Sequence, residues 1–357
     1  MQMVLFIISQ CIMKEERLRS IEEMGEFGLI EHLTKDARNI QDTTIKGIGD
    51  DAAVIGQGDD CQVVTTDMLV EGIHFDLMYT PLKHLGYKSV VVNLSDVYAM
   101  NAVPRQVTVS VAISGKFSVE ALEQFYEGVY AACKQYGVDL VGGDTTASVT
   151  GMMISVTALG TAAQKEIIYR DGAKVNNLVC VTGDLGAAYM GLQVLEREKK
   201  VFEEDSSIQP KLGDYEYVVG RFLKPDIRVE TLLKLRELDI RPTSMIDISD
   251  GLSSELLHIC KQSDCGVVIY QDKLPVTMEV NLAAAEFQIE PLIPALNGGE
   301  DYEILFTIPL SAHDKVKSIP GVSIIGNITE HKGKAIMMTG DGSAISLQAQ
   351  GWQAYGN

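Results

Sequence analysis

The chain has 357 residues, of which 46% are hydrophobic and 22% are charged, and its formal net charge at pH 7 is -19. These values are typical of a globular protein, and the length predicts about two domains. The negative charge and the absence of a lysine- and arginine-rich run argue against a protein that binds nucleic acid or an anionic membrane. The six cysteines form no CxxC pair and no Cys/His metal-binding pattern, and we interpret them as reduced thiols of a cytoplasmic protein.

The predicted elements alternate between helix and strand in two blocks, which indicates an α/β (α+β) fold. In the first block, helices are expected at residues 26–33, 82–100 and 118–136, and strands at 61–66, 107–113, 138–141 and 152–159. A polar, loop-like stretch at 161–177 separates the two blocks. The expected organisation is an N-terminal extension over residues 1–24, an N-terminal domain over 25–162 and a C-terminal α/β domain over 163–357.

The second block opens with an apolar strand at residues 178–182. Helical patterns follow at 187–199, 215–238 and 252–260, and strands are expected at 302–308 and 322–328. The apolar run at residues 3–8 is too short to span a membrane and lacks the basic flank of a signal peptide.

Six short acidic clusters are the most informative feature of the sequence. They lie at residues 47–51, 65–67, 93–96, 142–146, 247–251 and 298–301. Each combines carboxylates with glycine, serine or threonine, which suit turns where oxygen atoms converge on Mg²⁺. A single aspartate in such a cluster is commonly a helix cap or turn residue, and Asp250 before Gly251 could serve in this way. Six clusters in one chain instead predict a multi-metal site for phosphate chemistry.

The common nucleotide and hydrolase motifs do not account for these clusters. The chain has no GxxxxGK[ST] phosphate loop, no HExxH and no GxSxG. Gly47, Gly49 and Ala52 fit a loose dinucleotide fingerprint, but Asp50 and Asp51 would face and repel a pyrophosphate. Mg²⁺-dependent phosphoryl transfer fits better, because it mainly needs metal ions that bridge and neutralise the oxygens of a nucleoside triphosphate.

The motifs, taken in order, resemble the thiamine-monophosphate kinase family, in the superfamily of aminoimidazole ribonucleotide synthetase and selenophosphate synthetase. The resemblance covers nearly the whole chain and is carried by residues 25–30, 47–53, 65–75, 87–100, 142–146, 170–173, 181–183, 247–252 and 298–303. The combination of TTDMLVEGIHF at 65–75, GGDTT at 142–146 and GGEDYE at 298–303 is similar to the thiamine-phosphate branch in particular.

This resemblance implies a homodimer whose N-terminal sheets pair, with ATP as co-substrate between the two domains and several Mg²⁺ ions. It implies transfer of the ATP γ-phosphoryl group to thiamine monophosphate. The implied Mg²⁺ ligands, direct or through water, are Asp51, Thr65, Thr66, Asp67, Asp96, Asp144, Asp247 and Asp250. The implied ATP contacts are Tyr126, Gly143, Asp144, Arg170 and Ser249, and the implied thiamine-phosphate contacts are His74, Glu300 and Trp352. The residues implied to be catalytic are Asp67, Asp144, Arg170 and Asp250.

The chemistry of these residue types can be judged separately. The acceptor is a phosphate monoester that is largely deprotonated at pH 7, so the reaction needs no general base. Arg170 can offer a bidentate fork to phosphate oxygens, and a surface ion pair with Asp171 is the alternative. His74 also fits a half-buried structural imidazole. Trp352 fits either a cation-π partner of the thiazolium or a C-terminal packing residue.

Some alternatives stay open at this point. The C-terminal end, residues 351–357, differs from the aromatic-His-Phe ending that is common in the family, and residues 1–24 lie outside the resemblance. The chain lacks the N-terminal Cys with a nearby Lys in a Gly-rich segment that marks selenophosphate synthetase. An enzyme similar to aminoimidazole ribonucleotide synthetase and a catalytically silent Mg²⁺-nucleotide sensor are the competing hypotheses. Product analysis separates the two enzymes, and ATP binding without ADP formation would favour the sensor.

Overall fold

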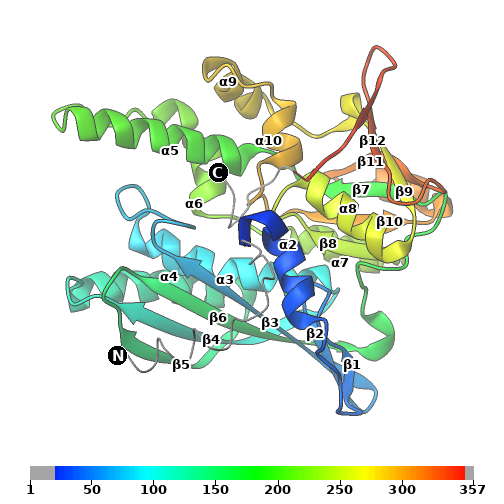
Figure 1. Ribbon diagram of the computed structural model, residues 1–357, viewed down its shortest axis with the longest axis horizontal. Coiled ribbons are helices and arrows are strands. Elements are labelled where there is room, and N and C mark those ends of the chain that lie inside the picture. The colour runs from blue at the N-terminus through cyan, green and yellow to red at the C-terminus, as the bar shows by residue number, and fades with distance from the viewer. Residues whose placement is uncertain (1–20, 350–357) are drawn as a thin grey trace, which may run out of the picture. The chain divides into compact units, whose positions relative to one another are not determined.

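The computed structural model describes residues 21–349 (Figure 1). Residues 21–38 belong to one compact unit and residues 39–349 to a second, larger one. In the smaller unit, α2 (Ile21–Thr34) is kinked at Gly25, where φ is 63° and ψ is 173°. The predicted helix 26–33 is the part of α2 that follows this kink. Nothing in residues 21–349 is a helix both long and apolar enough to cross a membrane.

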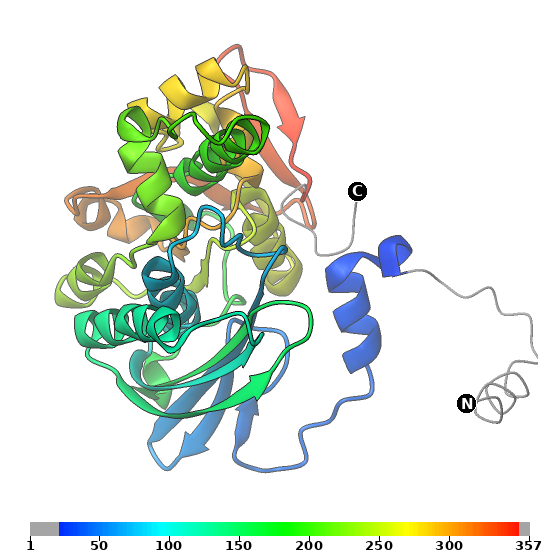
Figure 2. The same ribbon diagram turned by 90° about the vertical axis from the view of Figure 1, so that its left-hand side faces the viewer.

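A six-stranded sheet forms the first half of the larger unit. Its strands are β1 (Thr44–Lys46), β2 (Ala53–Gln57), β3 (Asp60–Val70), β4 (Val103–Ile113), β5 (Asp139–Ala147) and β6 (Met153–Ala163). They are ordered β1-β2-β3-β6-β4-β5, and only the pair β4 and β5 is parallel. Two helices, α3 (Leu82–Ala99) and α4 (Val119–Tyr136), run along one face of this sheet (Figures 1 and 2).

The helices α3 and α4 lie in close contact because each has a glycine where they meet. A Cβ atom on Gly86 would lie 1.9 Å from the carbonyl oxygen of Phe125, and one on Gly128 would lie 1.9 Å from that of Lys83. Any larger residue at either position would push the two backbones apart. The close fit fixes α3 against the rest of the first half.

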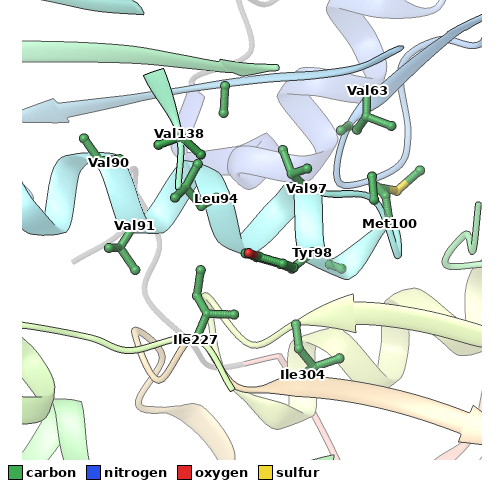
Figure 3. Close-up of a cluster of buried hydrophobic side chains, with 14 of the residues drawn as sticks. Val63, Val90, Val91, Leu94, Val97, Tyr98, Met100, Val138, Ile227 and Ile304 are labelled. Atoms are coloured by element: carbon green, nitrogen blue, oxygen red, sulfur yellow. The ribbon is translucent and has the colours of Figure 1, made fainter. Parts of the chain in front are cut away.

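The helix α3 is buried on more than one side, with 14 of its 18 residues buried. A helix that is buried on several sides is typical of a position inside a core, although the buried residues of α3 include the polar Lys88, Asn93 and Ser95. Figure 3 shows Val97 of α3 directed toward Val63 on β3, while Tyr98 points the other way, toward Ile227 and Ile304. These side chains belong to one hydrophobic cluster. The helix therefore joins the first sheet to the second half of the unit.

A seven-stranded sheet forms this second half. Its strands are β7 (Leu178–Thr182), β8 (Ser244–Asp247), β9 (Gly266–Tyr270), β10 (Ile304–Ile308), β11 (Val322–Thr329), β12 (Ala335–Met338) and β13 (Ala344–Ser346), ordered β13-β12-β9-β11-β7-β10-β8. All of β7 is buried, because both faces of the sheet are covered. Its residues Leu178 and Cys180 join the cluster that contains α3, whereas Val179 and Val181 pack in a second cluster with α8 (Leu252–Ser263).

The remaining helices differ from the prediction in two ways: the pattern at 215–238 is divided in two, and three helices were not predicted. The further helices are α5 (Ala187–Glu204), α6 (Glu216–Leu223), α7 (Val229–Glu237), α9 (Met278–Glu286), α10 (Leu292–Asn297) and α11 (His313–Lys317), and the last three are the ones that were not predicted. The single helical pattern predicted at 215–238 is in fact the two helices α6 and α7. Pro225 lies between them, and proline both lacks an N–H donor and disfavours helix in the residue before it. The five cysteines among the described residues are buried and unpaired by disulfides, and Cys11 lies outside these residues.

Candidate active site

Three carboxylates from distant parts of the chain meet where α3 lies against the second sheet. Asp51 precedes β2, Asp96 lies on α3 and Asp247 is the last residue of β8. One oxygen of each carboxylate lies within 4.8 Å of an oxygen of the other two. Asp51 and Asp247 are buried and Asp96 is half-buried. Close carboxylate oxygens of this kind are the ligands that hard divalent cations such as Mg²⁺ prefer.

Each carboxylate of this three-carboxylate cluster is held in place by the protein. The Thr65 hydroxyl donates to Asp96 at 2.6 Å, and the Ser95 hydroxyl donates to Asp247 at 2.6 Å. The Oδ2 atom of Asp51 is buried and has no hydrogen-bond partner within residues 21–349. A buried carboxylate oxygen without a donor is costly, and a bound cation would satisfy it. The donor set and this orphaned oxygen therefore fit a Mg²⁺ ion.

Two further predicted ligands lie close to the cluster. Asp67 is on β3, and its backbone N–H donates to Asn93 Oδ1 at 2.9 Å. Burial is the largest cause that raises the pKa of Asp96, and the negative charge of Asp67 is the second largest. Asp250 follows β8, and its charge also raises the pKa of Asp247. The structure thus gathers five of the predicted acidic ligands in one region.

The pKa values of these acids show how strongly the arrangement opposes their charges. Burial, partly opposed by Arg170, raises the pKa of Asp51 to about 7. Burial also raises the pKa values of Asp67 and Asp247 to about 6, and that of Asp96 well above its usual value. Like charges of neighbouring carboxylates add to burial at Asp51, Asp96 and Asp247. A divalent cation would remove this repulsion.

We expect Mg²⁺ to stabilise the protein, and we expect the gain to shrink as the pH falls. The pKa values of these acids lie above their ordinary value of 3.8, so at these positions the metal-free folded state binds more protons than the unfolded state. The contribution of these acids to stability therefore falls as the pH rises from about 4 to about 7. Mg²⁺ at about 100 times its dissociation constant adds about 2.7 kcal/mol, or roughly 3 to 4 °C in Tm for a chain of this length.

Thermal unfolding at pH 8 and pH 5.5, with and without Mg²⁺, measures this effect. The full gain is expected at pH 8, where the carboxylates are ionised. A smaller gain is expected at pH 5.5, where protons compete with the cation. An equal gain at both pH values would contradict a carboxylate site.

Arg170 contacts the cluster directly. Its Nε atom donates to Asp51 Oδ1 at 3.0 Å and its Nη2 atom donates to the same oxygen at 2.5 Å. Its backbone N–H donates to Asp50 Oδ1 at 3.1 Å, which anchors the loop that carries it. Asp171, the alternative partner suggested by the sequence, instead lies 3.9 Å from Lys46. The structure therefore favours an inward role for the Arg170 guanidinium.

The predicted substrate residue Glu300 is fixed beside the end of β8. Gly299 has a φ of 70°, and a Cβ atom there would lie 2.6 Å from the carbonyl oxygen of Ser249. The N–H of Glu300 donates to that same carbonyl at 2.7 Å, and the N–H of Tyr302 donates to the carbonyl of Ile248 at 2.9 Å. The motifs GGEDYE and DISDG therefore form one packed structure, which places the backbone of Glu300 beside Ser249, two residues after Asp247.

Thr66 projects away from its predicted companions. Side chains alternate between the two faces of a strand, so Thr65 and Asp67 share one face of β3 and Thr66 lies on the other. The hydroxyl of Thr66 donates to the carbonyl of Val156 at 3.0 Å. The contact of Thr65 with Asp96 shows that the first face is the one toward α3. A metal-binding role for Thr66 stays a prediction.

Asp144 lies apart from the cluster, exposed on the edge strand β5. Cross-strand pairs lead from Asp67 to Val156, then to Val109, and then to Gly143. Three strand spacings, roughly 14 Å, thus separate Asp67 from the residue before Asp144. Within one chain, Asp144 and Gly143 therefore lie too far from Asp67 to contact the same metal ion.

Three other predicted residues are placed less decisively. Tyr126, on α4, packs its ring against that of Tyr130, with the ring centroids 6.0 Å apart. The Nδ1 atom of His74 accepts from the backbone N–H of Val70 at 3.0 Å, which agrees with a structural imidazole. Trp352 lies outside the described residues. The roles assigned to these residues stay predictions.

One supporting residue was not predicted from the sequence. Glu255, in the first turn of α8, is buried and accepts from the backbone N–H of Asp250 at 2.9 Å. Burial, followed by the charge of Asp250, raises its pKa well above the usual value. An acidic residue in the first turn of a helix ordinarily indicates only a favourable interaction with the helix dipole. The contact of Glu255 with Asp250 therefore could not have been predicted from the local sequence pattern.

The fold and the site together define a class of protein, with two packed α/β halves and a carboxylate cluster suited to Mg²⁺ and phosphate. Residues 49–162 match the family model described as AIR synthase related protein, N-terminal domain. This agrees with the superfamily that the sequence motifs resemble.

Individual relatives then give the family. The chain is 36% identical over 314 residues to the thiamine-monophosphate kinase of Buchnera aphidicola subsp. Schizaphis graminum, which covers 86% of this chain and 92% of that protein. It is 30% identical over 340 residues to the thiamine-monophosphate kinase of Bacillus subtilis, with 93% and 100% covered. A solved structure of AaThiL complexed with AMPPCP and TMP matches with a TM-score of 0.79 at 29% identity, covering 95% of this chain and 100% of that one. The chain belongs to the thiamine-monophosphate kinase family, as the motifs predicted.

Proposed function

We propose that this protein transfers the γ-phosphoryl group of ATP to thiamine monophosphate, in a Mg²⁺-dependent reaction that yields thiamine diphosphate. The observation that carries this proposal is the three-carboxylate cluster with its orphaned Asp51 oxygen. It lies in a chain whose relatives are thiamine-monophosphate kinases. A similar protein has been solved with AMPPCP and TMP, which supports both substrates.

The residues of the site suit phosphoryl transfer by alignment and charge neutralisation. Asp51, Asp96 and Asp247 would hold Mg²⁺, which when bound supplies bridging and neutralisation of phosphate oxygens. The Arg170 fork lies beside this cluster, where it can also donate to a phosphate oxygen. The acceptor oxygen is already largely deprotonated at pH 7, because the second pKa of a phosphate monoester is about 6. The proposed role of the protein is thus to hold the two phosphates in line.

We also propose that the enzyme is a homodimer and that Asp144 acts in the site of a second copy. The edge strand β5 is exposed along almost its whole length, which is an unusual position for a family motif. Met68 and Val141 are large hydrophobic residues of the same sheet that are more than half exposed. A second copy that covered this sheet would bury them and carry the partner's Asp144 toward the TTD run at 65–67.

Mixing two inactive variants tests the function and the dimer together. The parent is expected to form thiamine diphosphate from thiamine monophosphate, ATP and Mg²⁺, and the variants Asp144→Asn and Asp247→Asn are each expected to form almost none. In a mixed dimer, one site would carry both defects and the other would carry neither. Random assortment of co-refolded chains should therefore restore about a quarter of the parent activity.

The outcomes of this experiment separate the two proposals. If the parent is active but the mixed variants stay inactive, Asp144 acts in the site of its own chain. This result would contradict the shared-site proposal and leave the kinase proposal standing. A parent that binds ATP but forms no thiamine diphosphate would contradict the kinase proposal. It would then favour another ATP-using enzyme of the superfamily or a nucleotide sensor.

A further inference from the structure

Lys88, on α3, is a buried cation that the proposed reaction does not yet use. Only 3% of its surface is exposed. A buried ammonium group is costly unless the protein supplies partners for it. The identity of those partners therefore indicates what the residue does.

The partners of Lys88 come from two separate elements of the second half. Its Nζ atom lies 2.5 Å from Oε2 of Glu300 and donates to the carbonyl oxygen of Phe222 at 3.0 Å. The ring of Phe222 lies beside the charge, with its centroid 4.0 Å from Nζ. The Phe222 carbonyl is in the last turn of α6, where backbone oxygens lack helical donors and carry partial negative charge. The ammonium group is thus enclosed by protein and is not available to a substrate.

Glu300 is the one partner that reaches the surface of the site. Its side chain is 27% exposed. Lys88 holds Oε2, and Oε1 has no hydrogen-bond donor in the part of the chain that the structure describes. The backbone there is strained, because Glu300 and Tyr302 have φ values of 58° and 50°. A loop in this conformation needs an external anchor to keep its carboxylate in one place.

The helix α3, which carries Lys88, also contacts the residues of the proposed metal site. Asn93, Ser95 and Asp96 of α3 contact Asp67, Asp247 and Thr65 respectively. Lys88 and Asp96 are eight residues apart, or about 12 Å along a helix. One rigid, buried helix therefore sets the separation between the three-carboxylate cluster and the Glu300 carboxylate.

We propose that Lys88 is a positioning residue. It fixes the Glu300 carboxylate so that the second oxygen of this carboxylate, Oε1, meets the cationic part of thiamine monophosphate, the phosphate acceptor. The thiazolium ring carries a permanent positive charge, and a fixed carboxylate is its natural partner. This inference rests on the proposed function. It adds a residue that would act on the acceptor and not on ATP.

The test compares Lys88→Met with Glu300→Gln, the double variant and the control Lys83→Met. Lys83 lies on the same helix and pairs with Glu127 at 3.0 Å, but both side chains are exposed. The Lys88→Met variant is expected to raise the KM for thiamine monophosphate, and its Kd by calorimetry without ATP, about 10- to 100-fold. The KM for ATP should stay within about twofold, as should both constants of the control. In the double variant, the KM and Kd for thiamine monophosphate should be at most about twofold higher than in Glu300→Gln.

The double variant also covers the case in which Lys88→Met alone fails to fold, because it replaces the whole ion pair by neutral groups. A double variant with the acceptor defect of Glu300→Gln and a parent-like KM for ATP then supports the proposal. Equal changes in both KM values, a fall in kcat alone, or additive effects in the double variant would overturn it. If the parent phosphorylates thiamine monophosphate and Lys88→Met binds it normally, only this inference fails. A parent that neither binds nor phosphorylates thiamine monophosphate overturns the proposed function and this inference with it.

Discussion

Replacing Asp247 by asparagine is expected to lower kcat about 10²- to 10³-fold while the protein stays folded. Asp247 is 2% exposed and contributes one oxygen to the three-carboxylate cluster. An asparagine keeps the shape and can still accept the hydrogen bond from Ser95, but it lacks the negative charge that holds Mg²⁺. The loss should therefore fall on the transition state, where the phosphate charge must be neutralised.

Stability provides the second readout for this variant. In the absence of Mg²⁺, the Tm of Asp247→Asn should equal or exceed that of the parent, because one of several close buried charges has been removed. The control Asp272→Asn changes an exposed aspartate outside the acidic clusters and should behave like the parent. Steady-state kinetics and thermal unfolding measure both effects. A variant that retains more than about a tenth of the parent kcat would exclude Asp247 as an essential ligand.

The Arg170→Lys variant is expected to lower kcat/KM for ATP about 10²-fold. Both Nε and Nη2 of Arg170 lie on Asp51, so the guanidinium orients that carboxylate as well as facing the site. A lysine is a single point charge on a flexible stem and cannot reproduce a planar fork. The charge is conserved, so a large effect would report geometry and not charge alone.

A matched control for this variant is Arg241→Lys, which changes an exposed arginine and should leave kcat/KM unchanged. The kinetics should be measured with ATP varied at saturating thiamine monophosphate. If Arg170→Lys keeps kcat/KM within about threefold of the parent, Arg170 only supports Asp51 and does not act on phosphate.

The long elements could be predicted from the sequence, and several short ones could not. The helices at 82–100 and 118–136 are long enough for their pattern to be distinct, and the structure has α3 and α4 there. β1, β8 and β13 are three or four residues long, which is too short for a periodic signal. These strands exist because neighbouring strands pair with them. The break at Pro225 could have been predicted, because proline is a local signal.

Some features of the candidate site could likewise be predicted from the sequence, and others could not. The aspartate clusters predicted a Mg²⁺ site, and Asp51, Asp67, Asp96, Asp247 and Asp250 do lie in one region. The position of Thr66 on the other face of β3 followed from strand alternation and could have been predicted. The separation of Asp144 could not, because it depends on the order in which β3, β6, β4 and β5 pair.

The sequence by itself determined the family and the kind of chemistry. Residue types and their order along the chain carry that information, and they do not depend on how the chain packs. Only the tertiary structure decided which oxygens converge, that Arg170 pairs with Asp51, and that Lys88 holds Glu300. The last two contacts join residues more than 100 positions apart, and all of them depend on how the two halves of the molecule pack. A local pattern contains no record of such packing.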